Sequence, residues 1–381
     1  MIKKLIKESK GNTFYIKGKG IPKGCEWCLK GAKVVLFLNG ICQKPDHCSW
    51  YCPISQERRD KNIAYADEIQ MLSKNDLIDE IEKIRAKGMS ITGGEPLLDS
   101  NLAITLEYIN YVKSIKGKKF HVHLYTNGIN FNEKIANKLA KAGLDEIRFH
   151  PPREKWKNVD LALDRGMSVG AEVPVIPTKE YMQYLEHFIK YLDKIGAEFI
   201  NLNEFEFCFP NSQALKEKGF YLEEGTIASV QNSKKIALEL LTKLAKETSL
   251  KIHFCTIRAK DFFQLKNRYL RRAKSIKNPY EVVTEEGLLF YAQIESNVKD
   301  ISKIKSKLSS EFKIPDKLMH VQNNKINLPY YIALKDEFIS FLEENSLSGY
   351  VVETIPFRGK YSQITEKTPL KIYKQETNGS I

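Results

Sequence analysis

The sequence has no long hydrophobic run. Its longest apolar stretch, VVLFL at residues 34–38, is far shorter than the roughly 20 residues that cross a bilayer as a helix. The N-terminus, MIKKLIKESKGN, lacks the apolar core and the cleavage site of a secretory signal. These two absences predict a cytoplasmic protein that does not associate with a membrane.

The chain also lacks internal repeats and long low-complexity tracts, and its hydrophobic content of 42% is ordinary for a folded protein of 381 residues. It has seven cysteines, an odd number, and no export signal. These features argue against a disulfide framework. We therefore expect reduced thiols that are available to a metal or to chemistry.

Acidic residues are fewer than basic ones, 47 against 60, which gives a net charge of +13. Such a balance is compatible with a polyanionic partner, RNA above all, but a composition rich in lysine and isoleucine gives the same balance without one. The densest basic cluster, KNRYLRRAKSIK at 266–277, is short and reads mostly as a solvated face. RNA is therefore one of several candidate partners.

Short β-rich runs alternate with amphipathic helical segments over the first half of the chain. Strands joined by right-handed crossovers lie parallel, so the pattern predicts an α/β fold, either an open doubly wound sheet or a partial barrel. The six predicted strands are 34–40, 88–94, 120–127, 144–151, 168–177 and 198–207.

The composition of the segments suggests four parts. They are an N-terminal extension with a CxxC pair (1–33), a partial barrel (34–215), a helical extension (216–278) and a C-terminal α+β module (279–381).

Three cysteines, Cys42, Cys48 and Cys52, lie close together in NGICQKPDHCSWYCPISQ. The polar residues between them are typical of a loop, which disfavours simple packing of buried thiols. Soft thiolates suit zinc or an iron–sulfur cluster. A structural zinc wants four ligands, and His47 is poorly placed as the fourth because it directly precedes Cys48. Three thiols instead fit a four-iron cluster that leaves one iron open to a small molecule.

A second motif, ITGGEPLL at 91–98, ends the second predicted strand. Gly93 and Gly94 would let the backbone approach a ligand closely, Pro96 would fix the following turn, and Glu95 offers a carboxylate beside it. Because it follows a three-cysteine loop on the preceding strand, we expect this motif to form an amine-binding backbone edge next to the cluster.

Together the two motifs resemble the radical S-adenosylmethionine (SAM) superfamily. Its members usually carry three cysteines after the first strand of a six-stranded partial barrel, an aromatic residue before the last cysteine, and a GGEP-like motif. Tyr51 precedes Cys52 here, and Gly93, Gly94, Glu95 and Pro96 match in full. The resemblance spans residues 34–207, although the gaps between the cysteines are five and three residues where three and two are usual.

The resemblance implies that Cys42, Cys48 and Cys52 hold a [4Fe-4S] cluster whose open iron binds the amino and carboxyl groups of SAM. One electron, from a reductant such as ferredoxin or flavodoxin, would cleave SAM to methionine and a 5′-deoxyadenosyl radical that abstracts hydrogen from a substrate. Segments such as HLYTNG and AGLDEIRFHPP look like a mainly archaeal group described as related to the pyruvate formate-lyase activating enzyme.

The pair Cys25 and Cys28, in GCEWC, is half of a metal site, unless it is a pair of plain loop thiols. We expect Cys255, in KIHFC, to be the third ligand of an auxiliary iron–sulfur or zinc site, with His253 as a further candidate ligand. Cys208 lies in the apolar context EFCF, which favours core packing.

Other polar residues stand near the ends of predicted strands, at the functional rim of an α/β barrel. By position, Thr126, Asn127 and Glu172 are expected to contact SAM. The residues expected to face the substrate are His150, Asn203, Glu204, Arg258, Lys260 and Arg268.

The sequence thus predicts a radical SAM enzyme with a partial (β/α)6 TIM-like barrel and a C-terminal α+β module. Its substrate is left open between RNA, a protein, as in glycyl-radical activation, and a small metabolite. A minimal activating enzyme would not need the residues after 279. Their presence favours a large substrate. The alternative from another class is a non-catalytic iron–sulfur or zinc protein that binds nucleic acid.

Overall fold

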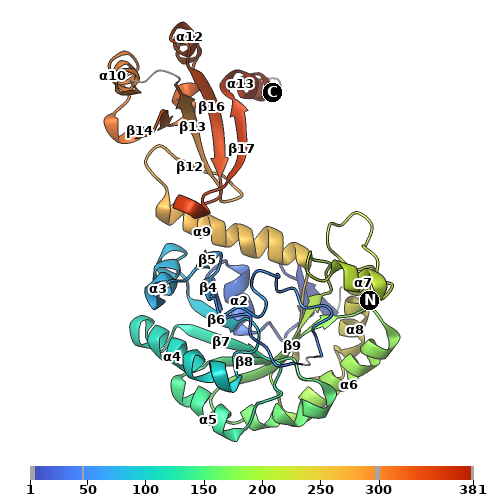
Figure 1. Ribbon diagram of the computed structural model, residues 1–381. Helices are drawn as coiled ribbons and strands as arrows, with labels where there is room; N and C mark the ends of the chain where they lie inside the picture. The colour runs from blue at the N-terminus through green and yellow to red at the C-terminus, as the bar shows by residue number, and fades with distance from the viewer. Residues whose placement is uncertain (1–4, 45–46, 297–300, 379–381) are drawn as a thin grey trace. The chain divides into compact units, whose positions relative to one another are not determined.

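The computed structural model describes residues 5–44, 47–296 and 301–378 of the chain (Figure 1). The chain divides into two compact units, Met1–Leu265 and Lys266–Ile381. Each unit has a sheet and a hydrophobic core of its own. They are therefore described one after the other.

The first unit is built on a large sheet with seven neighbouring parallel strands. Their order in the sheet follows their order in the sequence without a reversal, so the sheet is not doubly wound. Its parallel strands are β3 (Lys33–Phe37), β6 (Gly88–Thr92), β7 (His121–Thr126), β8 (Glu146–Phe149), β9 (Ser168–Val175), β10 (Phe199–Glu204) and β11 (Lys251–Cys255).

Short antiparallel strands flank both ends of this parallel series, and in the described residues β3 and β11 do not pair with each other. The barrel is therefore partial, as the sequence predicts. One end carries β1 (Ile6–Glu8) and β2 (Thr13–Ile16), and the other carries β4 (Tyr65–Ala66) and β5 (Ile69–Gln70).

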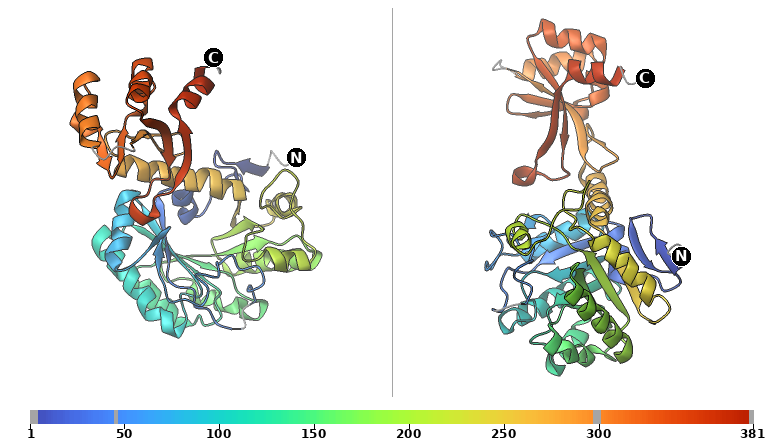
Figure 2. Two further views of the ribbon diagram at one scale, coloured as in Figure 1. Left: turned by 45° about the horizontal axis from the view of Figure 1, so that its top comes forward. Right: turned by 90° about the vertical axis from the view of Figure 1, so that its right-hand side faces the viewer.

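Helices connect the parallel strands and cover the outside of the sheet (Figures 1 and 2). Their apolar faces pack on Val, Ile and Leu side chains of the strands to form one continuous core. These helices are α3 (Lys74–Lys83), α4 (Asp99–Lys116), α5 (Glu133–Ala142), α6 (Lys179–Ile195) and α8 (Ser233–Leu244).

Smaller elements complete the first unit. They are α2 (Lys23–Leu29), the 3₁₀ turns η1 (Arg153–Asn158) and η2 (Asp160–Ala162), α7 (Ser212–Glu217) and the π-helix η3 (Ala259–Leu265).

The second unit begins with α9 (Lys266–Ile276) and contains an antiparallel sheet with helices on one face (Figure 2). Its strands are β12 (Val282–Val283), β13 (Leu289–Glu295), β14 (His320–Gln322), β15 (Lys325–Leu328), β16 (Ser348–Thr354) and β17 (Ile364–Pro369). The other elements are α10 (Ile301–Glu311), η4 (Asp316–Leu318), α11 (Tyr330–Ala333), α12 (Asp336–Glu344), η5 (Gly359–Tyr361) and α13 (Leu370–Asn378).

The two units divide the chain differently from the four predicted parts. The segment predicted as a separate helical extension supplies β11, a seventh parallel strand, because its apolar residues Ile252 and Phe254 pack in the core of the barrel. The predicted N-terminal extension supplies β1, β2 and α2 to the same unit. The predicted α+β module lies within the second unit.

No described helix has the length and the apolar composition that crossing a membrane requires.

Candidate active site

A cavity of about 310 Å³ opens at the carboxyl ends of the parallel strands. This is the rim where α/β barrels carry their functional residues, because the loops that follow the strands converge there. Its lining comes from the cysteine loop, from the end of β6 and from strands β7 to β10. The lining residues that the sequence analysis named are Cys42, Cys48, Tyr51, Gly93, Gly94, Glu95, Pro96, Thr126, Asn127, His150, Glu172, Asn203, Glu204 and Lys260.

The cysteine loop contributes thiols to this cavity. Cys42, Cys48 and Cys52 are half-buried and not engaged in disulfides, and the first two line the cavity. Among the described residues, no three His, Cys, Asp or Glu side chains lie close enough together to bind one metal ion. An iron–sulfur cluster is larger than an ion and spreads its thiolate ligands over several irons, so three thiols outside disulfides in a loop at a cavity fit such a group.

Aromatic packing anchors the cysteine loop to the segment that follows β10. The Trp50 ring stacks on Phe220 at a centroid distance of 6.1 Å and meets Phe205 edge to face at 6.0 Å. The Nδ2 group of Asn211 donates a hydrogen bond to the carbonyl oxygen of Tyr51 at 3.1 Å. The loop is thus held in place both by aromatic side-chain packing and by a hydrogen bond to its backbone.

The two glycines of the GGEP motif allow a close approach between two segments of the chain itself. A Cβ atom on Gly93 would lie 2.4 Å from the carbonyl oxygen of Asn39, and one on Gly94 would lie 2.0 Å from that of Ile41. The backbone N–H groups of Gly94 and Glu95 donate to these same two oxygens at 2.8 and 2.9 Å. The motif is therefore bonded directly to the start of the cysteine loop.

Glu95 joins β6 to β7 below the cavity. Its buried carboxylate accepts hydrogen bonds from the Thr126 hydroxyl at 2.8 Å, from the Asn127 N–H at 2.7 Å and from the Leu97 N–H at 2.9 Å. Burial raises the pKa of Glu95 to about 7, although these donors oppose the shift. Three residues that the sequence assigned to SAM binding are thereby brought into one hydrogen-bonded group.

Tyr51 and His150 meet at the cavity wall. The Tyr51 hydroxyl lies 3.0 Å from Nε2 of His150, and the His47 ring lies edge to face against His150 at 4.9 Å. Burial raises the pKa of Tyr51, and burial together with His47 lowers the pKa of His150 to about 3. Both groups are consequently neutral at physiological pH, so either can share a proton with a bound molecule without first losing a charge.

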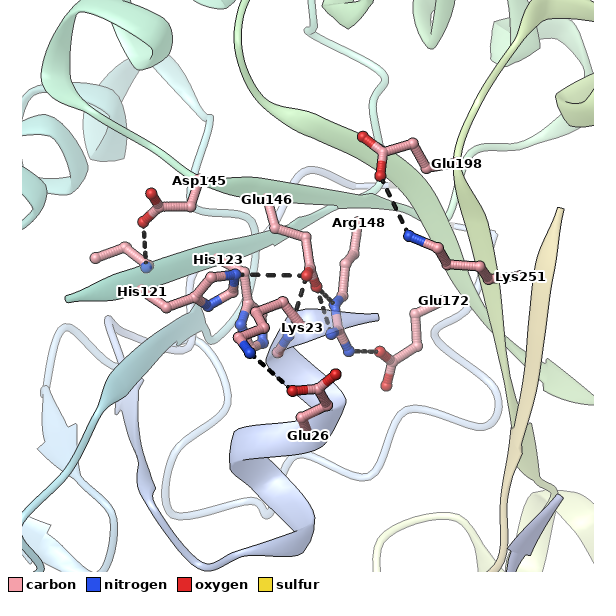
Figure 3. Close-up of polar contacts among 12 residues, drawn as sticks. Lys23, Glu26, His121, His123, Asp145, Glu146, Arg148, Glu172, Glu198 and Lys251 are labelled. Carbon is pink, nitrogen blue, oxygen red and sulfur yellow. Dashed lines mark hydrogen bonds and ion pairs between the residues drawn. The ribbon is translucent and has the colours of Figure 1, made fainter. Parts of the chain in front are cut away.

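Arg148, which lines the cavity, forms a buried ion-pair network (Figure 3). Its Nε donates to Glu146 at 2.6 Å and its Nη1 donates to Glu172, whose other oxygen accepts from Asn203 at 2.9 Å. Burial alone would raise the pKa of Glu146, but the guanidinium outweighs it and lowers that pKa to about 2. The same cation lowers the pKa of Glu172.

The sequence analysis did not single out Arg148 or Glu146. The signal that could have found them is the alternation in DEIRF, where two opposite charges occupy one face of a strand that is otherwise apolar. In a barrel that face points inward, and buried charges there must be paired.

Lys260 and Glu206 form a second ion pair on the cavity lining, at 3.2 Å. Lys260 is carried by the π-helix η3, an element that often occurs at functional sites. Nearby, Glu204 accepts hydrogen bonds from the Ser229 hydroxyl and from the Ile257 N–H. Lys260 and Glu204, two of the residues expected from the sequence to face the substrate, therefore both lie on the cavity lining. Arg258 and Arg268 are not among the lining residues described here.

The cavity and its cysteine loop define a class, the α/β-barrel enzymes with an iron–sulfur cluster. The model of the radical SAM superfamily matches residues 42–152, which include the cysteine loop and the GGEP motif. A protein of Methanocaldococcus jannaschii, provisionally named a glycyl-radical enzyme activating enzyme, is 34% identical over 317 residues, covering 78% of this chain and 80% of that protein. The chain belongs to the radical SAM superfamily.

Other matches are shorter or more distant. GTP 3′,8-cyclase of Corynebacterium glutamicum is 36% identical over 127 residues, which cover 26% of this chain and 33% of the cyclase. Streptococcus suis SuiB with bound S-adenosylmethionine superposes with a TM-score of 0.41 at 11% identity, over 59% of this chain and 50% of that one. The methyltransferase TsrM of Kitasatospora setae superposes with a TM-score of 0.35 at 12% identity, over 53% of this chain and 42% of TsrM. The chain spans half or less of these two structures.

The family membership makes the protein an enzyme, whose cofactors are a [4Fe-4S] cluster and SAM. The alternative of a non-catalytic protein that binds nucleic acid is thereby set aside.

Proposed function

We propose that Cys42, Cys48 and Cys52 hold the [4Fe-4S] cluster, and that SAM binds beside it against the GGEP motif. When bound, these groups supply one-electron chemistry that converts SAM to methionine and 5′-deoxyadenosine at the expense of a substrate hydrogen. The observation that carries the proposal is one cavity lined jointly by the cysteine loop and by the GGEP motif.

The residues around this cavity have distinct tasks in the proposal. Gly94 and Glu95 fix the cysteine loop through their backbone N–H groups, so the loop and the SAM site form as one unit. Thr126 and Asn127 are held in place by Glu95, at positions where they can meet the ribose or the carboxylate of SAM. Tyr51 and Glu172 remain candidate contacts to SAM.

Exclusion of water is the second task. The Trp50, Phe205 and Phe220 rings pack between the cysteine loop and the segment after β10, where Phe205 gives the cavity an apolar wall. A reactive carbon radical needs such a cover because side reactions with solvent and solutes would consume it.

The substrate is proposed to be a polypeptide. The support is the relative that is provisionally named a glycyl-radical enzyme activating enzyme, because its similarity extends over about four fifths of both chains. On the cavity lining, Asn203, Glu206 and Lys260 offer both hydrogen-bond donors and acceptors, as the polar groups of a peptide backbone require.

The reaction type is tested by anaerobic reconstitution with iron and sulfide, followed by dithionite and SAM. We expect 5′-deoxyadenosine from the native protein and none above background from Cys42→Ala. Equal yields from both proteins would contradict the proposal. A Cys208→Ala variant, which leaves the three-cysteine loop intact, is the matched control and should retain turnover.

The substrate class is tested by isotope transfer. The enzyme is incubated with unlabelled SAM and an extract of its own cells grown in deuterated medium, and deuterium in 5′-deoxyadenosine is measured by mass spectrometry. Protease treatment of the extract should abolish the transfer, whereas nuclease treatment and removal of small molecules should not. Transfer that survives protease but not nuclease would replace the polypeptide by RNA.

A further inference from the structure

Three cysteines outside the cluster loop come together inside the barrel. Cys25 and Cys28 lie one turn apart on α2, and Cys255 ends β11, more than two hundred residues later. Cys25 and Cys255 are buried, Cys28 is half-buried, and all three are free thiols.

The helix α2 is fitted into the interior of the barrel at Gly24. The Gly24 N–H donates to Glu146 at 3.1 Å, and a Cβ atom at this position would lie 2.5 Å from Nη2 of Arg148 and 2.6 Å from the His123 ring. Only a residue without a side chain allows this approach, which sets α2 directly against Glu146, His123 and Arg148 of the strands (Figure 3).

Two side-chain amides connect these thiols to β10 and β11. The Cys28 thiol donates to Oε1 of Gln264 at 2.7 Å, and Nε2 of the same Gln264 donates to Sγ of Cys255 at 3.3 Å. On the other side, the Cys25 thiol approaches Oδ1 of Asn201 at 3.7 Å, and Nδ1 of His253 contacts that same oxygen. The Gln264 amide thus lies between Cys28 and Cys255, and the Asn201 amide lies between Cys25 and His253.

His253 adds a nitrogen atom, Nε2, that could ligate a metal. Its side chain is 1% exposed, and among the described residues its buried Nε2 has no hydrogen-bond partner. The contact of Nδ1 with the Asn201 oxygen assigns the proton to Nδ1, which leaves a lone pair on Nε2. His253 and Cys255 are two residues apart on one strand and therefore share its face.

Charged side chains of both signs surround the thiols. Lys33, which is 8% exposed, interacts electrostatically with Cys28, and Arg148, which is 2% exposed, interacts with Cys25. Glu146 and Glu172, which pair with Arg148, act on Cys25 with the opposite sign. Lys33 is therefore a cation that would offset part of the negative charge of thiolates bound to iron.

We propose that Cys25, Cys28 and Cys255 ligate a second iron–sulfur cluster, with His253 as the candidate fourth ligand. A zinc ion would require its ligand sulfurs within roughly 4 Å of one another, given Zn–S bonds of about 2.3 Å. In the structure the Gln264 amide bridges Cys28 and Cys255, and it must turn away for either metal group to bind. A cluster binds each thiolate through a different iron, so its ligand sulfurs stand farther apart than those of a zinc ion.

The test removes the first cluster and asks whether iron remains. The full-length chain with Cys42, Cys48 and Cys52 all replaced by Ala is purified anaerobically after reconstitution, and its iron, sulfide and zinc are measured. We expect roughly four iron and four sulfide per chain, with visible absorption that dithionite bleaches. Adding Cys25→Ala and Cys28→Ala should remove them, whereas adding Cys208→Ala should not.

Three outcomes would overturn the inference: absence of iron from the triple variant, zinc in its place, or iron that survives replacement of Cys25 and Cys28. Because buried substitutions can unfold a protein, circular dichroism is recorded for each variant, and the half-buried Cys28→Ser is tested alone for a weakened cluster. The result is separable from the proposed function. Production of 5′-deoxyadenosine by the native protein tests the first cluster, and iron in the triple variant tests only the second.

Discussion

At the scale of the residue, the barrel depends on buried charges that are each compensated in a specific way. Glu95 is surrounded by hydrogen-bond donors, whereas Arg148 lies between two carboxylates. Removing a partner from either group leaves an unpaired polar atom in a medium that solvates it poorly. These side chains therefore contribute to stability as well as to the cavity.

Glu95 makes the stability of the cofactor-free protein depend on pH. Because its pKa is raised from 4.5 to about 7 in the folded state, the folded protein retains a proton that the unfolded chain releases. This contribution is complete below pH 4.5 and is lost as the pH rises through 7, so the unfolding free energy should fall by up to roughly 3 kcal/mol.

Denaturant unfolding at a series of pH values measures this dependence. In Glu95→Gln the corresponding part of the slope should vanish, while Glu26→Gln, in the exposed ion pair with Lys23, should keep it. The same slope in the wild type and Glu95→Gln would rule out this origin of the dependence.

Arg148 is expected to be the most sensitive charged residue of the interior. Arg148→Met leaves Glu146 and Glu172 without their cation, and loss of one partner of a buried pair typically costs about 3–5 kcal/mol. Lys74→Ala, which breaks the exposed pair with Glu107, should cost less than about 1 kcal/mol. The loss of unfolding free energy in the two variants is compared by urea denaturation. A similar loss in both would show that Arg148 is not paired with Glu146 and Glu172 as described.

At the scale of the element, the contact between the end of β6 and the cysteine loop couples fold to cofactor. The N–H groups of Gly94 and Glu95 bond to the carbonyl groups of Asn39 and Ile41, just before Cys42. Neither bond survives if the two segments separate. The sequence suggested that the glycines serve a ligand, and the structure shows that they also serve this contact.

Gly94→Ala should therefore displace the cysteine loop. Its Cβ atom would meet the Ile41 carbonyl oxygen at 2.0 Å, so we expect the first cluster to be lost together with most production of 5′-deoxyadenosine. Gly196→Ala has open space around its Cβ atom and only a left-handed backbone with φ of 80°, which should cost about 1–2 kcal/mol without loss of iron. Iron retained in Gly94→Ala would refute the coupling.

The helix α3 begins and ends through local interactions. Asp76 accepts hydrogen bonds from the N–H groups of Leu72 and Ser73 at its start. Arg85, with φ of 50°, makes the turn after its end, and β6 starts at Gly88.

At the scale of the whole molecule, the chain consists of two units with separate cores, and the first unit alone supplies the whole cavity lining. Residues 1–278, which end after α9, should consequently fold and still convert SAM to 5′-deoxyadenosine. The measurement is a thermal unfolding curve together with the anaerobic turnover assay. An insoluble fragment, or one without turnover, would show that the second unit is needed for the first.

The sequence by itself determined the alternation of strands and helices, and with it a parallel α/β sheet, because hydrophobic periodicity and crossover handedness are local rules. The choice of a partial barrel over a doubly wound sheet came from the resemblance to the radical SAM superfamily. It also showed the cysteine loop and the GGEP motif, because both are contiguous in the chain. The seventh strand, β11, was not assigned to the barrel from the sequence, since its partner β10 precedes it by almost fifty residues.

Only the tertiary structure decided which distant side chains meet. Arg148 with Glu172, Glu95 with Asn127, and Cys28 with Gln264 are pairings across strands or across more than two hundred residues. No local pattern encodes them, because they depend on how the strands curve into a barrel and on which side chains then share its closed, weakly solvating interior.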